Sequence, residues 1–330
     1  MALDHPLLTT QVPITKAEAR FELGDRVHAV GSCFAEHLAE KLRRYLFPVV
    51  LNPYGVMYNP ISLARAIEPG WSEPELFLHD GLWRSLRHHS SLAWTSREQS
   101  LHLLANAERY KQHALKTSRW LVLTLGTGYA FTLATGGEVV ANCQRLPNSL
   151  FQRRLLDLQE CRDALEPPLH NWLQEDEARQ VVLTVSPVRY LRDGLVENSR
   201  GKALLHLLCQ ALETAHQRIS YFPAFEIVCD ELRSYRYFES DLVQPNALAV
   251  DIVWNRFQKA YFQEEDLSTL TLMEKLVRAF EHRSGPLTDS RALGRKSLQR
   301  LEQLRTKAPN LDLNLWEERF RAMLDDPIKG

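Results

Sequence analysis

Strands and helices alternate in the hydrophobic pattern over the first two thirds of the chain. Residues 120–125 and 180–185 are almost continuously apolar, which is typical of strands buried on both faces of a parallel sheet. Shorter apolar runs predict three more strands, at residues 26–30, 49–51 and 219–222. Apolar residues at helical spacing predict helices over residues 34–45, 157–172 and 202–218. This alternation predicts a doubly wound α/β domain with a mostly parallel sheet of about five strands.

From Leu267 onward the pattern becomes wholly helical, with breaks at Gly285-Pro286 and Pro309. We therefore divide the chain into a domain over residues 1–265 and a C-terminal helical extension over residues 266–330. The extension either packs on the domain or joins copies of the chain into a homo-oligomer. Residues 76–94 are expected to be irregular or to form short strands.

The charge balance argues against two classes of partner. The chain has 40 basic and 41 acidic side chains and a net charge of −1, so nucleic acid and anionic membranes are not expected partners. A basic bias over residues 291–305 is interpreted as a solvated helix face, with nucleic-acid binding as the alternative. Neither a signal-peptide pattern nor an apolar run of about 20 residues occurs, which predicts a cytoplasmic protein.

The cysteines give no sign of a disulfide framework or a zinc site. They are odd in number and include no CxxC pair: Cys33, Cys143, Cys161, Cys209 and Cys229. Such cysteines are typical of reduced thiols in a cytoplasmic protein. We expect neither a metal nor an organic cofactor.

The turn Gly31-Ser32-Cys33 is the chemical candidate, because it ends the first predicted strand and opens the first helix. Ligands of open parallel sheets bind beyond the carboxyl ends of the strands. The first turn of a helix offers unpaired N–H groups and a positive dipole end, which lower the pKa of a nearby thiol and can bind an oxyanion. Cys33 is therefore either a nucleophile or a small packing residue at a tight turn.

Several segments, taken in order, resemble the GSCFA family, which belongs with the SGNH/GDSL hydrolases. Residues 31–35 spell its signature, and residues 52–60 resemble its second block. Further matching segments lie at residues 83–90, 123–127, 142–143, 185–189, 198–202, 221–226, 230–238 and 241–245. The resemblance spans roughly Pro13 to Phe262.

The resemblance implies a three-layer αβα, flavodoxin-like (SGNH-type) fold with Cys33 at the nucleophile position and Ser32 as the second choice. It implies that Gly55 and Cys33 supply the N–H groups of an oxyanion hole. The loop at Gly126 and Thr127 lacks the asparagine usual in SGNH enzymes, so Asn142 is the candidate for that amide. Arg189 either clamps a carboxylate or phosphate or pairs with Asp193 or Glu226.

Two histidines usual in such proteins are replaced by glutamine in this chain. The expected aspartate–histidine pair is Asp241 and Gln244, and Gln144 stands where a histidine usually follows Asn-Cys. A glutamine amide cannot act as a general base near neutral pH. Three explanations stay open: the thiol needs no strong base, His89 serves instead, or the protein only binds a ligand.

The activity that the resemblance implies is hydrolysis or transfer of an acyl group from an ester, thioester or activated amide. The substrate is a small-molecule or carrier-bound acyl or glycan-type compound. The alternative is a catalytically impaired, SGNH-like ligand-binding protein.

Overall fold

The computed structural model describes residues 10–70, 73–281, 289–309, 311 and 313–324. At its centre is a five-stranded sheet in which every neighbouring pair is parallel. Its strands are β1 (Val27–Gly31), β2 (Val49–Leu51), β5 (Trp120–Leu125), β9 (Gln180–Val185) and β10 (Ile219–Tyr221). They lie in the order β10-β9-β5-β1-β2. The predicted α/β class with a mostly parallel sheet is confirmed.

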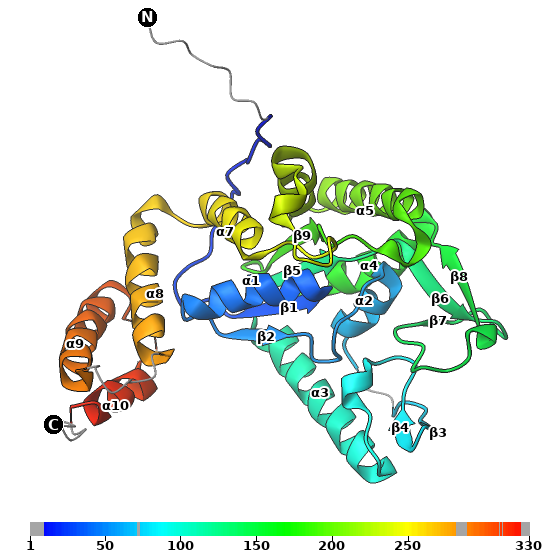
Figure 1. Ribbon diagram of the computed structural model, residues 1–330, viewed down its shortest axis with the longest axis horizontal. Helices are drawn as coiled ribbons and strands as arrows, with labels where there is room; N and C mark the ends of the chain where they lie inside the picture. The colour runs from blue at the N-terminus through cyan, green and yellow to red at the C-terminus, as the bar shows by residue number, and fades with distance from the viewer. Residues whose placement is uncertain (1–9, 71–72, 282–288, 310, 312, 325–330) are drawn as a thin grey trace, which may run out of the picture.

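Helices cover both faces of this sheet (Figure 1). One face carries α1 (Cys33–Arg44) and α7 (Ala247–Tyr261). The other face carries α2 (Pro60–Ile67), α3 (Arg97–Thr117), α4 (Leu158–Gln174) and α5 (Leu195–Ala215). Val122 packs in the first core, whereas its neighbours Leu121 and Leu123 pack in the second. Because successive side chains of a strand point to opposite faces, a strand that serves two cores must be apolar throughout.

Side-chain caps fix where several helices begin. The Asn59 side chain accepts the Ser62 N–H at 2.9 Å, with Pro60 in the first turn of α2. Ser96 accepts the Gln99 N–H at 3.3 Å and caps α3. Each cap pairs one of the N–H groups that a helix leaves free at its start.

Two smaller sheets interrupt the alternation. Strands β3 (Phe77–His79) and β4 (Leu82–Arg84) form an antiparallel pair. Strands β6 (Tyr129–Leu133), β7 (Val139–Val140) and β8 (Phe151–Leu155) form an antiparallel sheet in the order β7-β6-β8. The hydrophobic pattern did not predict this second sheet, because its strands are short and β6 and β8 are partly exposed.

Short helical turns complete the described chain. They are η1 (Ser90–Leu92), η2 (Asn148–Leu150), η3 (Leu191–Asp193), α6 (Ala224–Glu226), η4 (Ile227–Leu232), η5 (Tyr235–Tyr237) and η6 (Glu264–Asp266). Within the described residues, no helix combines the length and the apolar character needed to cross a membrane.

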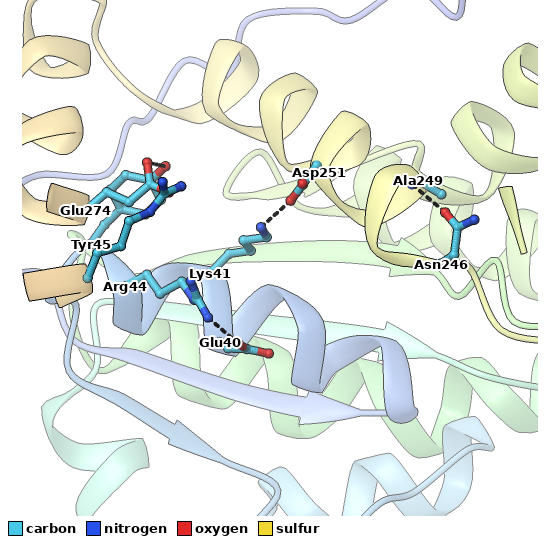
Figure 2. Close-up of polar contacts among 9 residues, drawn as sticks. Glu40, Lys41, Arg44, Tyr45, Asn246, Ala249, Asp251 and Glu274 are labelled. Atoms are coloured by element: carbon cyan, nitrogen blue, oxygen red, sulfur yellow. Dashed lines mark hydrogen bonds and ion pairs between the residues drawn. The ribbon is translucent and has the colours of Figure 1, made fainter. Parts of the chain in front are cut away.

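The C-terminal part is helical, with α8 (Leu267–Glu281), α9 (Ser290–Lys307) and α10 (Asn314–Ala322). Met273, Leu301 and Phe320 belong to the same hydrophobic core as α1 and α7. Figure 2 shows polar contacts beside α1, where Lys41 pairs with Asp251 of α7 and the Tyr45 hydroxyl donates to Glu274 of α8 at 3.4 Å. The tail therefore packs on the domain; its use in self-association stays a prediction.

Candidate functional site

The carboxyl ends of β1 and β5 meet at the switch point of the sheet. These strands are neighbours, and the next strands along the chain, β2 and β9, lie on opposite sides of the pair. Gly31 ends β1 with φ +149°, and a Cβ there would lie 2.3 Å from the Thr124 carbonyl oxygen. Only glycine permits this approach. Open α/β sheets bind their ligands at such points.

Cys33 is the first residue of α1 and is half-buried. Its Sγ lies 3.6 Å from the Tyr58 hydroxyl oxygen. Burial and, after it, the contact with Cys33 raise the pKa of Tyr58, so the phenol stays protonated and can donate. The thiol thus lies at a helix N-terminus beside a neutral hydrogen-bond donor.

Ser32 forms hydrogen bonds with the backbone at the start of α1. Its side chain is only 2% exposed, and its Oγ accepts the Phe34 N–H at 3.3 Å as the N-cap of α1. Its own N–H donates to the Thr124 carbonyl at 3.0 Å. Ser32 thus has a structural role at the start of α1, and its role as the second-choice nucleophile stays a prediction.

The loop after β5 is fastened from two sides. The Tyr58 carbonyl accepts the N–H groups of Gly126 at 2.9 Å and Thr127 at 3.0 Å. The buried Lys202 ammonium donates to the carbonyls of Gly126 and Ser186, each at 2.6 Å. Burial lowers the pKa of Lys202 to about 7. Tyr58 and Lys202 both lie in segments that resemble the family, but the sequence analysis assigned neither of them a role.

The loop after β2 brings Gly55 against His89. Gly55 has φ +81°, and a Cβ there would lie 2.2 Å from the Cβ of His89. The Gly55 N–H, expected in the oxyanion hole, donates to the Asn52 carbonyl at 2.8 Å. The His89 Nδ1 lies 3.0 Å from the Ser91 hydroxyl. In the described part of the chain no hydrogen bond joins His89 to Cys33, and its role as a base stays a prediction.

Gln144 is a buried residue whose side chain holds two segments of backbone together. It is 1% exposed, and its amide donates to the carbonyls of Ser85 at 2.7 Å and His88 at 2.8 Å. Its backbone N–H donates to the Asn142 side chain at 2.8 Å. The next residue, Arg145, shares its left-handed backbone, with φ of +55° for Gln144 and +63° for Arg145. The hydrogen bonds of Gln144 stabilise a loop conformation that L-residues rarely adopt.

Arg189 makes neither ion pair expected from the sequence. Its guanidinium lies 4.2 Å from the ring centre of Phe238 and 4.7 Å from that of Tyr235. Asp193 is paired with another arginine, and Glu226 accepts from a tyrosine. The expected pairing is therefore wrong, because two aromatic rings from a distant segment take up this cation.

Asp241 closes a turn. Its carboxylate accepts the N–H groups of Val243 at 2.8 Å and Gln244 at 3.0 Å, and these bonds hold the pKa of Asp241 below its usual value. The Arg189 N–H donates to the Val243 carbonyl at 3.2 Å, which ties this segment to the chain after β9. In the described residues Gln244 forms no hydrogen bond to Cys33, so its place beside the thiol stays a prediction.

A cavity of about 330 Å³ lies beside Tyr58. Thr127, Asn142 and Gln144, all predicted site residues, line it. Three arginines also line it, Arg145, Arg153 and Arg192, and we call it the arginine pocket. The hydrophobic pattern and the motifs gave no signal for these arginines. Among the described residues, no cluster of His, Cys, Asp and Glu could hold a metal ion.

The fold and the site define an α/β protein with a cysteine at the switch point of a parallel sheet. The sequence pattern of the GSCFA family matches residues 26–257, and the chain belongs to the GSCFA family. No curated protein matches the chain. A solved structure described as a candidate platelet activating factor from Streptococcus pneumonia is similar over 72% of this chain and 83% of that chain, with 10% identity and a TM-score of 0.37. This likeness is too weak to bear on the site.

Proposed function

We propose that the protein is an SGNH-type acyl hydrolase or acyltransferase in which Cys33 attacks an ester, thioester or activated amide. The observation that carries the proposal is the position of the Cys33 thiol, at the start of α1 and 3.6 Å from the Tyr58 hydroxyl. The strand order supports the SGNH-type assignment, because β2-β1-β5-β9-β10 is a flavodoxin-like order with helices on both faces.

The chemistry proceeds in two steps. The Cys33 thiolate forms a C–S bond to the carbonyl carbon, and the bond from that carbon to the leaving oxygen, sulfur or nitrogen breaks. The leaving group takes a proton from solvent. Water or an acceptor alcohol or amine then attacks the acyl carbon, gives up its proton to solvent, and breaks the C–S bond so that the thiolate is released. The protonated Tyr58 hydroxyl donates to the sulfur in its anionic form.

A thiol suits a site that lacks the usual histidine. It is intrinsically more nucleophilic than a hydroxyl, so a cysteine needs less help from a base than a serine does. His89 is the alternative base, and a His89→Ala variant that loses turnover would support that alternative.

Hydrolysis of p-nitrophenyl acetate and butyrate tests the proposal. We expect Cys33→Ala to lower kcat/KM at least about a hundredfold, because the nucleophile is removed. Mass spectrometry should find an acetyl group on Cys33 in the native protein. Cys229→Ala, which removes another half-buried thiol, is the matched control and should keep its activity.

Turnover that persists in both Cys33→Ala and Ser32→Ala would contradict this mechanism. If the native protein forms no acyl adduct and shows no turnover, the ligand-binding alternative is favoured. That alternative draws on one observation: in the described residues no histidine forms a hydrogen bond to Cys33.

A further inference from the structure

The arginine pocket has an unbalanced charge. Among the described residues that line it, none is Asp or Glu, whereas three are arginines. Arg153 is paired with Asp193. In the described part of the chain no ion pair joins Arg145 or Arg192 to a carboxylate. The pocket therefore keeps two guanidinium groups whose charge nothing in its lining offsets.

Two of the arginines lie against the same ring. The guanidinium carbon of Arg192 lies 4.5 Å from the centre of Phe131, and that of Arg153 lies 4.7 Å from it. Because Arg153 is paired with Asp193, Arg192 is the guanidinium of these two whose charge a bound anion would offset. A guanidinium that stacks on a ring keeps its in-plane N–H groups available for bidentate bonds to a carboxylate or phosphate.

The third arginine is presented by strained backbone. Arg145 and Gln144 both have left-handed φ, and the buried Gln144 amide holds the loop through two carbonyls. Strained backbone that the surrounding structure fixes is often found at ligand sites. Arg145 is exposed in this loop and lines the pocket, and no carboxylate of the described residues forms an ion pair with it.

Tyr58 connects the pocket to the thiol. It lines the pocket, and its hydroxyl is the polar contact of Cys33 at 3.6 Å. Tyr58 is therefore common to the lining of the pocket and to the surroundings of the nucleophile. A volume of about 330 Å³ suits part of a small molecule.

We propose that the arginine pocket binds the anionic group, a carboxylate or a phosphate, of the acyl substrate whose carbonyl reacts at Cys33. The assignment to a substrate rests on the proposed function, whereas the anion site can be tested without turnover. Asn142, also in the lining, offers an amide to the same group.

Calorimetric titration of the Cys33→Ala protein tests the anion site directly. The probes are monomethyl adipate, which carries one carboxylate, and dimethyl adipate, which is neutral and similar in shape. We expect the monoanion to bind more tightly and to weaken as NaCl is added. The double variant Arg145→Gln/Arg192→Gln should weaken monoanion binding about tenfold or more. Titration with inorganic phosphate distinguishes a phosphate preference from a carboxylate preference.

Arg319→Gln is the matched control. Arg319 is exposed and lies 5.2 Å from the centre of Phe280, so its replacement removes one arginine charge and the same kind of ring contact outside the pocket. It should leave monoanion binding unchanged. Equal binding of the neutral and anionic probes, or full affinity in the double variant, would overturn the proposal.

Esterase assays separate the two proposals. These assays use protein that keeps Cys33. There the substitutions Arg145→Gln/Arg192→Gln should lower kcat/KM about tenfold for the p-nitrophenyl monoester of adipate and leave it unchanged for the corresponding methyl diester. Anion binding without any turnover would refute the acyl chemistry alone. Turnover of both esters with no dependence on the arginines would refute the anion site alone.

Discussion

At the scale of single residues, the site depends on a side chain that is absent. Gly31 lets the end of β1 lie against the Thr124 carbonyl, and this approach brings the Ser32-Cys33 turn to the end of β5. The position of the turn could be predicted from the sequence, because a strand, a glycine and a helix follow one another directly. The strict need for glycine could not, because the clashing atom belongs to another strand.

We expect Gly31→Ala to lower the free energy of unfolding by about 3 kcal/mol or more, since it adds backbone strain and a clash with a fixed carbonyl. Urea denaturation measures this loss. Gly136→Ala is the control, because Gly136 has φ +91° but open space around its Cβ position, so it should cost only about 1 kcal/mol. Equal losses in the two variants would show that the close approach costs nothing.

The partners of Gln144 and Arg189 mark the limit of sequence reasoning at this scale. The sequence analysis named both residues as candidate site residues. Their contacts lie with Ser85 and His88 in one case and with Phe238 in the other. Segments so far apart along the chain meet only through the fold, and neither spacing nor composition encodes that meeting.

At the scale of elements, secondary structure was predicted correctly where burial alone determines the hydrophobic pattern. The strands β5 and β9 are buried on both faces, so their apolar runs are unambiguous. The sequence analysis did not anticipate α3, a long helix with many polar residues whose buried face includes Glu108 and Lys111. These two side chains form a buried ion pair, so the face of α3 that packs against the core contains charged residues and lacks a clear apolar pattern.

The caps of α1 and α3 allow a matched test of Ser32. We expect Ser32→Ala and Ser96→Ala each to lower the free energy of unfolding by about 1 kcal/mol, because each removes an N-cap. Thermal or urea unfolding measures the loss. If Ser32 is only a cap, the esterase activity of its folded variant should match that of Ser96→Ala. A loss of activity in Ser32→Ala alone would make the hydroxyl part of the chemistry.

At the scale of the whole molecule, buried histidines tie stability to pH. His28 lies on β1 with no exposed surface, and burial lowers its pKa to about 4. Burial likewise lowers the pKa of His88 to about 4. In the unfolded chain both would bind a proton near pH 6.5. The unfolded state thus binds more protons between these values, so stability is fully present above about pH 6.5 and falls as the pH drops toward 4.

His28→Leu should therefore flatten the pH dependence. Between pH 7 and 5 the native protein should lose about 2 kcal/mol more of its unfolding free energy than the variant does, since each pH unit below 6.5 costs about 1.4 kcal/mol per histidine. Urea titrations at the two pH values measure the difference. Parallel losses in the two proteins would mean that His28 binds its proton without unfolding.

The core shared by α1 and the C-terminal helices can be completed only late in translation. The apolar face of α1 leaves the ribosome early, whereas Met273 and Phe320, which close the same core, are among the late residues. At about 5–20 residues per second, that face waits on the order of ten seconds or more for its cover. During this interval it is open to chaperones and to other nascent chains, so slower translation should lengthen the period in which the chain can aggregate.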